Sequence, residues 1–394
     1  MSEMILGPGK KHGEAMPRRT DWVTRFFCTA CFLAFVTAGP AWSVGLLASD
    51  PPPPETTEPE AATEDTAKGV QITFHGYLTQ AYAKSDNGQI LGIPEKGTAD
   101  YRKAALQLRA DLTSNDTFAL QFAHERFGES VIQSFHSDVE LDWLFYEHRW
   151  DDSSVKIGKV LIPFGIYNEV RDVGTLLPFY RPSANFYGEG AFTSETVDGI
   201  VLSHRFALGG PWQLASDVHY GNWEYINRSA TFTKNKVRDS IGVELWLTTP
   251  IPGLRIGAGG IRYDVLPPEG RRWKTYHISA EGEFGRVVTH VEYKNIDFGL
   301  GTYEGGYGHL GFKVTDKITV NVQRDFANLN INFFRKGDFD DETALGVNYA
   351  IRPDLVVKLE HHWNQGFTAE VPKQNFFAPK VKINYSLVSL STSF

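Results

Sequence analysis

The sequence predicts an all-β fold in which sixteen antiparallel strands close into one transmembrane barrel. Three features support this prediction. Stretches of about 10 to 13 residues alternate apolar and polar side chains throughout residues 70–394, short and long connections alternate between them, and the chain ends in Phe394. Because lipid-facing and lumen-facing side chains alternate in such a barrel, its composition stays close to that of a water-soluble protein.

The composition fits this fold and excludes two other classes. The chain of 394 residues is 13% aromatic and contains 37 glycines but only 2 cysteines. It has no run of about 20 apolar residues, which every span of a helical membrane protein would need. A net charge of -8 argues against a nucleic-acid-binding protein, which would carry a basic surface.

The first segment, residues 1–48, is predicted to be a signal peptide. Basic residues precede an apolar run at 26–38, and small residues follow it as candidate cleavage sites. Cys28 and Cys31 have the spacing of a thioredoxin-like redox site, but both lie within this run and are expected to be removed with it. Residues 49–69 are rich in proline, glutamate and threonine, so we expect a disordered acidic tail before the barrel at 70–394.

The strands are predicted from period-two patterns. Between Ala104 and Leu112, every second residue is apolar and the residues between them are mostly polar. A strand with one apolar and one polar face fits a wall that separates lipid from a water-filled lumen. The same pattern recurs at 118–122, 241–247, 287–293, 310–314, 318–322, 345–349 and 355–359.

The connections give the number of strands. Short hairpin turns are expected at 114–116, 151–153, 209–211, 250–253, 284–286, 315–317 and 352–354. Longer loops are expected near 85–101, 128–138, 164–195, 227–236, 267–272, 298–306, 329–341 and 366–376. These connections join sixteen strands in strict short and long alternation, with short turns at the periplasmic side and long loops outside.

The connection after the fifth strand, residues 163–195, is the longest and is expected to fold into the barrel as a constriction loop. Long loops without secondary structure are commonly functional. Opposed charges across a lumen can select solutes by size and by field. The alternative is an exterior cap whose aromatic residues pack on the rim. The candidate constriction residues are Glu169, Arg171, Asp172, Tyr180, Arg181 and Glu189.

The polar faces of the strands predict the lumen wall. Basic and acidic residues are nearly balanced on these faces, so the sequence indicates no ion preference. A register slip of one residue would also invert the faces of any strand. The candidate wall residues are Lys103, Arg109, Asp111, Lys156, Lys358 and Glu360.

Motifs for chemistry are not supported, so we expect no enzyme activity, cofactor or metal. The glycines at 306, 308 and 311 fit a dinucleotide fingerprint by spacing, but a strand continues where a helix would be needed. The pairs His361-His362 and Ser203-His204 are neighbours in strands, so their side chains should point to opposite faces. A catalytic triad assembled from distant residues stays an open alternative.

Two segments resemble a known family. The stretch Gly158-Lys159, Pro163-Phe164-Gly165, Tyr167-Asn168-Glu169 and Arg171-Asp172 resembles the corresponding region of the phosphate-selective porin O and P family. The carboxy end, with Phe394, Thr392, Leu390 and Val388 on one face, resembles the signal that the barrel assembly machinery reads in bacterial outer-membrane proteins.

The resemblance implies an outer-membrane porin, a water-filled channel for passive diffusion of small hydrophilic solutes and ions. It also implies contact with outer-membrane lipid and lipopolysaccharide, and assembly as a homotrimer. The alternative is a substrate-specific channel, for phosphate or another anion, with a binding site at the constriction loop. Anion-specific members of the family line their pores with arginines and lysines, a pattern that the mixed charges of this sequence do not reproduce.

Overall fold

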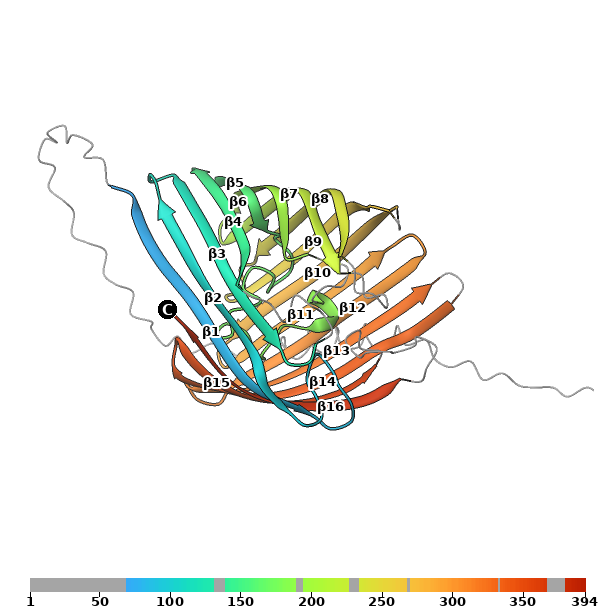
Figure 1. Cartoon of the computed structure of the whole chain (residues 1–394). Coiled ribbons are helices and arrows are strands. Elements are labelled where there is room, and N and C mark those ends of the chain that lie inside the picture. The colour runs from blue at the N-terminus through green and yellow to red at the C-terminus, as the bar shows by residue number, and fades with distance from the viewer. Residues whose placement is uncertain are drawn as a thin grey trace, which may run out of the picture. The chain divides into compact units, whose positions relative to one another are not determined.

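The chain forms a closed barrel of sixteen antiparallel strands (Figure 1). The computed structural model describes residues 69–130, 139–188, 194–226, 234–267, 270–331, 334–366 and 380–394. Each strand pairs with its sequence neighbours, and β1 pairs with β16 to close the wall. The predicted fold class is therefore confirmed. The strands are β1 Gln71–Ser85, β2 Thr98–Asp111, β3 Asp116–Phe127, β4 Glu140–Trp150, β5 Ser153–Leu161, β6 Thr196–Gly209, β7 Trp212–Ile226, β8 Lys234–Thr248, β9 Leu254–Val265, β10 Arg271–Phe284, β11 Val287–Asp297, β12 Gly301–Lys313, β13 Ile318–Ile331, β14 Phe334–Arg352, β15 Leu355–Gly366 and β16 Val381–Ser393.

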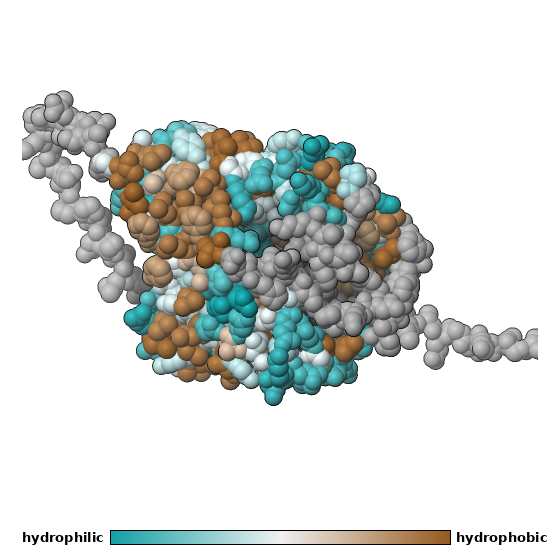
Figure 2. All heavy atoms as spheres, in the orientation of Figure 1, coloured by the Kyte–Doolittle hydropathy of each residue, from teal (hydrophilic) through white to brown (hydrophobic). Residues whose placement is uncertain are grey.

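The period-two patterns place apolar side chains on the outer face of the wall. Leu106, Phe122, Leu310 and Phe312 are each more than 40% exposed, although all are large and apolar. Figure 2 shows apolar side chains gathered over large parts of the visible outer surface. Closure into a barrel pairs the backbone groups of every strand, which a membrane-embedded sheet requires. No helix among the described residues has the length and apolar character needed to cross a bilayer.

The barrel has two distinct ends. The turn end carries Gln71 at the start of β1, Ser393 at the end of β16, and the seven short turns, all at the predicted positions. The loop end carries the remaining connections. The predicted signal peptide and most of the acidic tail, residues 1–68, lie outside the described residues.

Two of the predicted long loops are wrong. β11 ends at Asp297 and β12 begins at Gly301, while β13 ends at Ile331 and β14 begins at Phe334. Most of the segments expected to be loops, 298–306 and 329–341, therefore belong to strands, and short and long connections do not alternate strictly. The physical reason is that polar and glycine residues, which suggest a loop in a soluble protein, are ordinary on the lumen face of a barrel strand.

The connection between β5 and β6 folds into the barrel, as predicted, and the exterior-cap alternative is wrong. In its described part a short helix, α2 (Ala184–Tyr187), contacts β11, β12 and β13 (Figure 1). Earlier in the connection, Thr175 Oγ1 lies 3.1 Å from Ser393 Oγ on β16. We call residues 162–188 the infolded loop.

Two apolar clusters lie inside the loop-end half of the barrel. The larger joins Phe164, Phe186 and Tyr187 of the infolded loop to inward side chains of β5 to β13, among them Trp223 and Trp273. The smaller brings residues 90–93 of the first connection against Tyr101, Phe127 and Tyr180. The sequence did not predict that this first connection folds inward as well.

Candidate functional site

The infolded loop is fastened to the barrel wall by a buried carboxylate on β11. Glu292 is 1% exposed and accepts hydrogen bonds from the backbone N–H of Ile166, at 2.9 Å, and from the hydroxyl of Tyr187, both in the loop. Tyr307 and Ser279 on the wall donate to the same carboxylate, at 2.7 and 2.6 Å. Donors from the loop and from two strands thus converge on one acceptor, which fixes both ends of the loop to this part of the wall.

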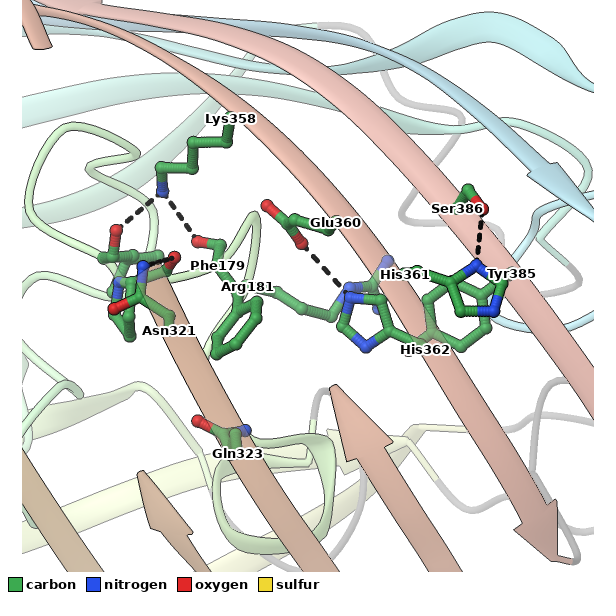
Figure 3. A network of polar contacts seen from close by, with 12 residues as sticks. Phe179, Arg181, Asn321, Gln323, Lys358, Glu360, His361, His362, Tyr385 and Ser386 are labelled. Atoms are coloured by element: carbon green, nitrogen blue, oxygen red, sulfur yellow. Dashed lines mark hydrogen bonds and ion pairs between the residues drawn. The ribbon is translucent and has the colours of Figure 1, made fainter. Parts of the chain in front are cut away.

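A second fastening uses a buried ammonium group on β15. Lys358 Nζ donates to the carbonyl oxygens of Leu177 and Phe179, at 2.7 and 2.8 Å, and the side chain is 1% exposed (Figure 3). Asn348 Nδ2 on β14 donates to the carbonyl of Pro178 between them, at 3.0 Å. Three successive loop carbonyls, which have no partner within a helix or strand, are thereby paired by side chains of the wall.

A third fastening is an ion pair with β2. Lys103 Nζ lies 2.5 Å from Asp172 Oδ1 of the loop and 3.6 Å from Glu125 Oε1 on β3. Glu195, which follows the loop, lies close enough to Asp172 for the two charges to interact. Burial, reinforced by the carboxylates of Asp172 and Asp142, raises the pKa of Glu195 well above its ordinary value.

A row of polar side chains continues along β14 and β15 beside the loop. His362 lies 3.2 Å from Glu360 and stacks on Tyr385 with ring centroids 4.4 Å apart (Figure 3). On its other side it lies 2.9 Å from Glu342. Asn364 Nδ2 then joins Glu342 to Asp340, at 3.2 and 3.1 Å. These polar groups give the loop-end half a hydrophilic strip in addition to its two apolar clusters.

The turn-end half of the lumen has a different character, with partly exposed charges in ion pairs. Arg109 pairs with Asp111 at 2.8 Å, and Arg149 pairs with Glu147 at 2.5 Å. Arg255 and Lys313 pair with Glu281 and Glu283 on β10. Ion pairs with at least one partner exposed to water contribute little stability but keep the wall hydrophilic.

The predicted constriction residues divide between buried and exposed positions. Glu169 is exposed, and the charged groups that act on it are of both signs: Lys156, Asp217, Glu244 and Arg255. Arg171 and Asp172 are buried. Tyr180 and Arg181 do not face open lumen: Tyr180 is buried in the smaller apolar cluster, and the guanidinium of Arg181 lies 5.2 Å from the Phe127 ring centroid. Glu189 lies outside the described residues.

The candidate wall residues Lys103, Arg109, Asp111, Lys156, Lys358 and Glu360 stand at alternating positions on the inner face of β2, β5 and β15. Sequence reasoning missed Asp340 and Glu342, because both were close to or inside a segment expected to be a loop. If the strand predicted at 345–349 had been extended towards the N-terminus, the two-residue spacing of Asp340 and Glu342 would have placed both on its inner face.

The neighbouring residues of the two histidine-containing pairs lie on opposite faces of their strands, as the sequence predicts. His362 faces inward, whereas His361 on the outer face contacts Ser386 at 2.8 Å and the Trp363 ring, with centroids 4.4 Å apart. Ser203 donates to Asp217, and its neighbour His204 pairs instead with Ser153. The glycines at 306, 308 and 311 lie within β12. Among the described residues there is no group of three or more His, Cys, Asp or Glu side chains arranged to hold a metal ion.

The barrel is similar to solved structures of outer-membrane proteins. It aligns with OmpT of Vibrio cholerae at a TM-score of 0.54 and 13% identity, over 84% of this chain and 99% of that one. OmpF of Salmonella typhi, in a complex with daunomycin, aligns at 0.58 and 11% identity, over 83% and 98%. The outer membrane channel DcaP of Acinetobacter baumannii aligns at 0.52 and 9% identity, over 83% and 98%. No family model matches the chain, and no curated protein matches it by sequence.

Proposed function

We propose that this chain is a porin of the bacterial outer membrane, a channel for passive diffusion of small hydrophilic solutes and ions. The observation that carries the proposal is the infolded loop, held inside a closed barrel by Glu292, Lys358 and Lys103. A loop that is fastened at three places on the inner wall can set a fixed width for a passage. The fold that this barrel shares with OmpF and DcaP supports the same interpretation.

The mechanism needs no chemical step. Solutes would move down their concentration gradient, and the loop would filter them by width and by field. Exposed Glu169 on the loop interacts with the cations Lys156 and Arg255 and with the carboxylates Asp217 and Glu244, so charges of both signs lie on this side of the loop. Glu189 is proposed as a further constriction residue because of its position in the sequence of this loop.

The same proposal includes the partners that the sequence predicts. The apolar outer face would contact membrane lipid and lipopolysaccharide, and Phe394 would serve as the assembly signal. We also propose export through the segment 1–48 and assembly as a homotrimer. One solved structure of the Vibrio OmpT is described as a trimer form, and that barrel shares this fold at a TM-score of 0.53.

Single-channel recording tests the proposal directly. The full-length chain would be expressed, purified from outer membranes and inserted into planar bilayers in KCl. We expect stepwise conductance that rises linearly with salt concentration, as in an unsaturated water-filled pore. A mock preparation from cells that lack the gene is the control. Absence of conductance would refute the channel, and a small current that phosphate blocks would replace it with the substrate-specific alternative.

A further inference from the structure

Two histidines meet on the inner wall beside the infolded loop. His290 on β11 and His309 on β12 are direct cross-strand partners. Their Nδ1 atoms are 3.0 Å apart, their ring centroids are 5.0 Å apart, and His309 is 4% exposed. A contact between two ring nitrogens at this distance requires that one of them carries a proton and the other carries none.

The infolded loop contacts this pair at two of its residues. Tyr167 Oη lies 2.7 Å from His290 Nδ1, and the two rings have centroids 5.4 Å apart. Further along the loop, the ring of Phe179 lies against His309 with centroids 6.1 Å apart. The positions of two parts of the loop therefore depend on where these two imidazoles lie.

Asn321 on β13 determines where the protons of the pair lie. Its Nδ2 donates to the carbonyl of Pro178, at 3.5 Å, so its Oδ1 is the acceptor that faces His309 Nε2, at 3.1 Å. Nε2 of His309 therefore carries a proton, and Nδ1 of the neutral ring carries none. His290 Nδ1 must then donate to His309, and the hydroxyl oxygen of Tyr167 accepts from the same N–H.

This arrangement accepts one additional proton but not two. The lone pair of His290 Nε2 can take the first proton, which leaves the contact between the rings intact. A second proton has to go to His309 Nδ1, at which the N–H of His290 already points. Two N–H groups would then face each other across 3.0 Å, with a positive charge on each ring. The two imidazoles would have to separate.

The charged groups around the pair are engaged with other partners. Glu281 on β10 is the cross-strand partner of His290, but its carboxylate pairs with Arg255 on β9. Arg255 is also close enough to His290 for the two positive charges to repel once the imidazole is protonated. No carboxylate among the described residues lies within ion-pair distance of either imidazole, so none neutralises a charge there. The other titratable groups on the neighbouring elements have these partners: Glu283 with Lys313, Glu292 with Tyr187 and Tyr307, and Asp325 with Gln323.

From these contacts we propose that His290 and His309 form an acid-responsive latch for the infolded loop. The inference rests on the proposed channel function and adds its regulation. With at most one additional proton, the pair supports Tyr167 and Phe179 and keeps the loop in place. With two, the rings separate, Tyr167 loses its contact, and this part of the loop is released, so the passage becomes wider and less rigid. Histidine is the side chain that ordinarily gains its charge between neutral and mildly acid pH.

Single-channel recordings of the full chain over a range of pH test the latch. We expect the conductance of the wild type and its open-channel noise to rise about two-fold as the pH falls from about 7 to about 4.5. H309Q keeps an acceptor for His290 and a donor for Asn321 but has no site for the second proton, so it should lose most of this rise. H361Q is the matched control, because His361 lies on the outer face of β15, 2.8 Å from Ser386, and this variant should respond like the wild type.

The outcomes separate the latch from the channel. No conductance in any preparation would refute the channel itself. A wild-type conductance that does not change with pH would refute the latch and leave the channel standing. A rise that H309Q retains in full would also refute the latch, and would assign the response to carboxylates that fasten the loop, such as Glu292 and Asp172. If H309Q does not assemble, H290Q removes the other proton site, and an undiminished rise in that variant would count equally against the latch.

Discussion

At the scale of single residues, the infolded loop depends on a few buried side chains whose charges match its polar groups. Glu292 accepts from a loop N–H and a loop hydroxyl, and Lys358 donates to two loop carbonyls. Charge-assisted hydrogen bonds of this kind are stronger than neutral ones, particularly where water is excluded. Removing either side chain would leave loop groups buried without partners.

The first expectation concerns K358M, which keeps the volume of the side chain but removes the donor. We expect a larger and noisier single-channel conductance, because residues 177–179 lose their fastening. We also expect the free energy of unfolding to fall by about 2 kcal/mol, the usual cost of unpaired buried polar groups. Exposed Lys84 on the outer side provides the control variant K84M. An unchanged conductance in K358M would show that Lys358 does not hold the loop.

The second expectation concerns pH and Glu195. Burial and two neighbouring carboxylates raise the pKa of this group, so the folded chain keeps a proton that the unfolded chain loses at lower pH. Its contribution to stability is therefore complete below the pKa of the unfolded chain and is lost as pH rises through the folded pKa. We expect the free energy of unfolding of E195Q to fall less steeply with pH than that of the wild type.

Chemical denaturation at a series of pH values measures this difference. The variant E224Q, at an exposed position, is the control and should follow the wild type. Parallel curves for E195Q and the wild type would contradict the assignment, because they would show that Glu195 titrates alike in the folded and unfolded chains.

At the scale of elements, the wall is predictable from sequence, whereas the contents of the lumen are not. Alternation of side chains located many of the strands, and the turn residues gave their number, sixteen, and all seven short turns at the right places. The loop assignment was less successful. It failed at the starts of β12 and β14, where inward glycines and carboxylates look like loop residues. Local sequence also gives no means of finding the fastenings: Glu292 is 126 residues from Ile166, and Lys358 is 181 residues from Leu177.

The corrected start of β14 gives a third expectation, which cysteine labelling tests. Both cysteines of the sequence lie before residue 49, so single cysteines can be introduced into a barrel that has none. We expect D341C to react with a lipid-soluble maleimide and D340C to be protected, because neighbouring strand residues point to opposite faces. Equal labelling at both positions would indicate an irregular loop, as the sequence had suggested.

At the scale of the whole molecule, the pairing of β1 with β16 that closes the barrel extends to the last residue. The backbone of Phe394 exchanges hydrogen bonds with Gly76 on β1, at 3.0 and 3.1 Å, and its side chain is 70% exposed on the outer face. An exposed aromatic side chain at the carboxy end adds little to packing. It is well placed for recognition by another protein or for contact with lipid.

We therefore expect F394A to reduce the amount of folded barrel in cells, by roughly half or more, while refolding of the purified chain into detergent proceeds with little change. Folded and unfolded barrel can be distinguished by their mobility in gels before and after heating. F312A, at another exposed position of the outer face, is the control. A refolding defect of F394A in detergent would indicate a structural role for the side chain, and normal levels in cells would argue against a recognition role.

The fastenings of the loop also bear on the order in which the barrel is built. Lys358 lies on the last strand but one, and Thr175 meets Ser393 across 218 residues, so the loop has no complete docking surface until the final strands are in place. Contacts between distant parts of a chain form late, because they carry the largest entropic cost. A half-built barrel would therefore contain an undocked loop, and narrowing of the passage would be among the last events of biogenesis.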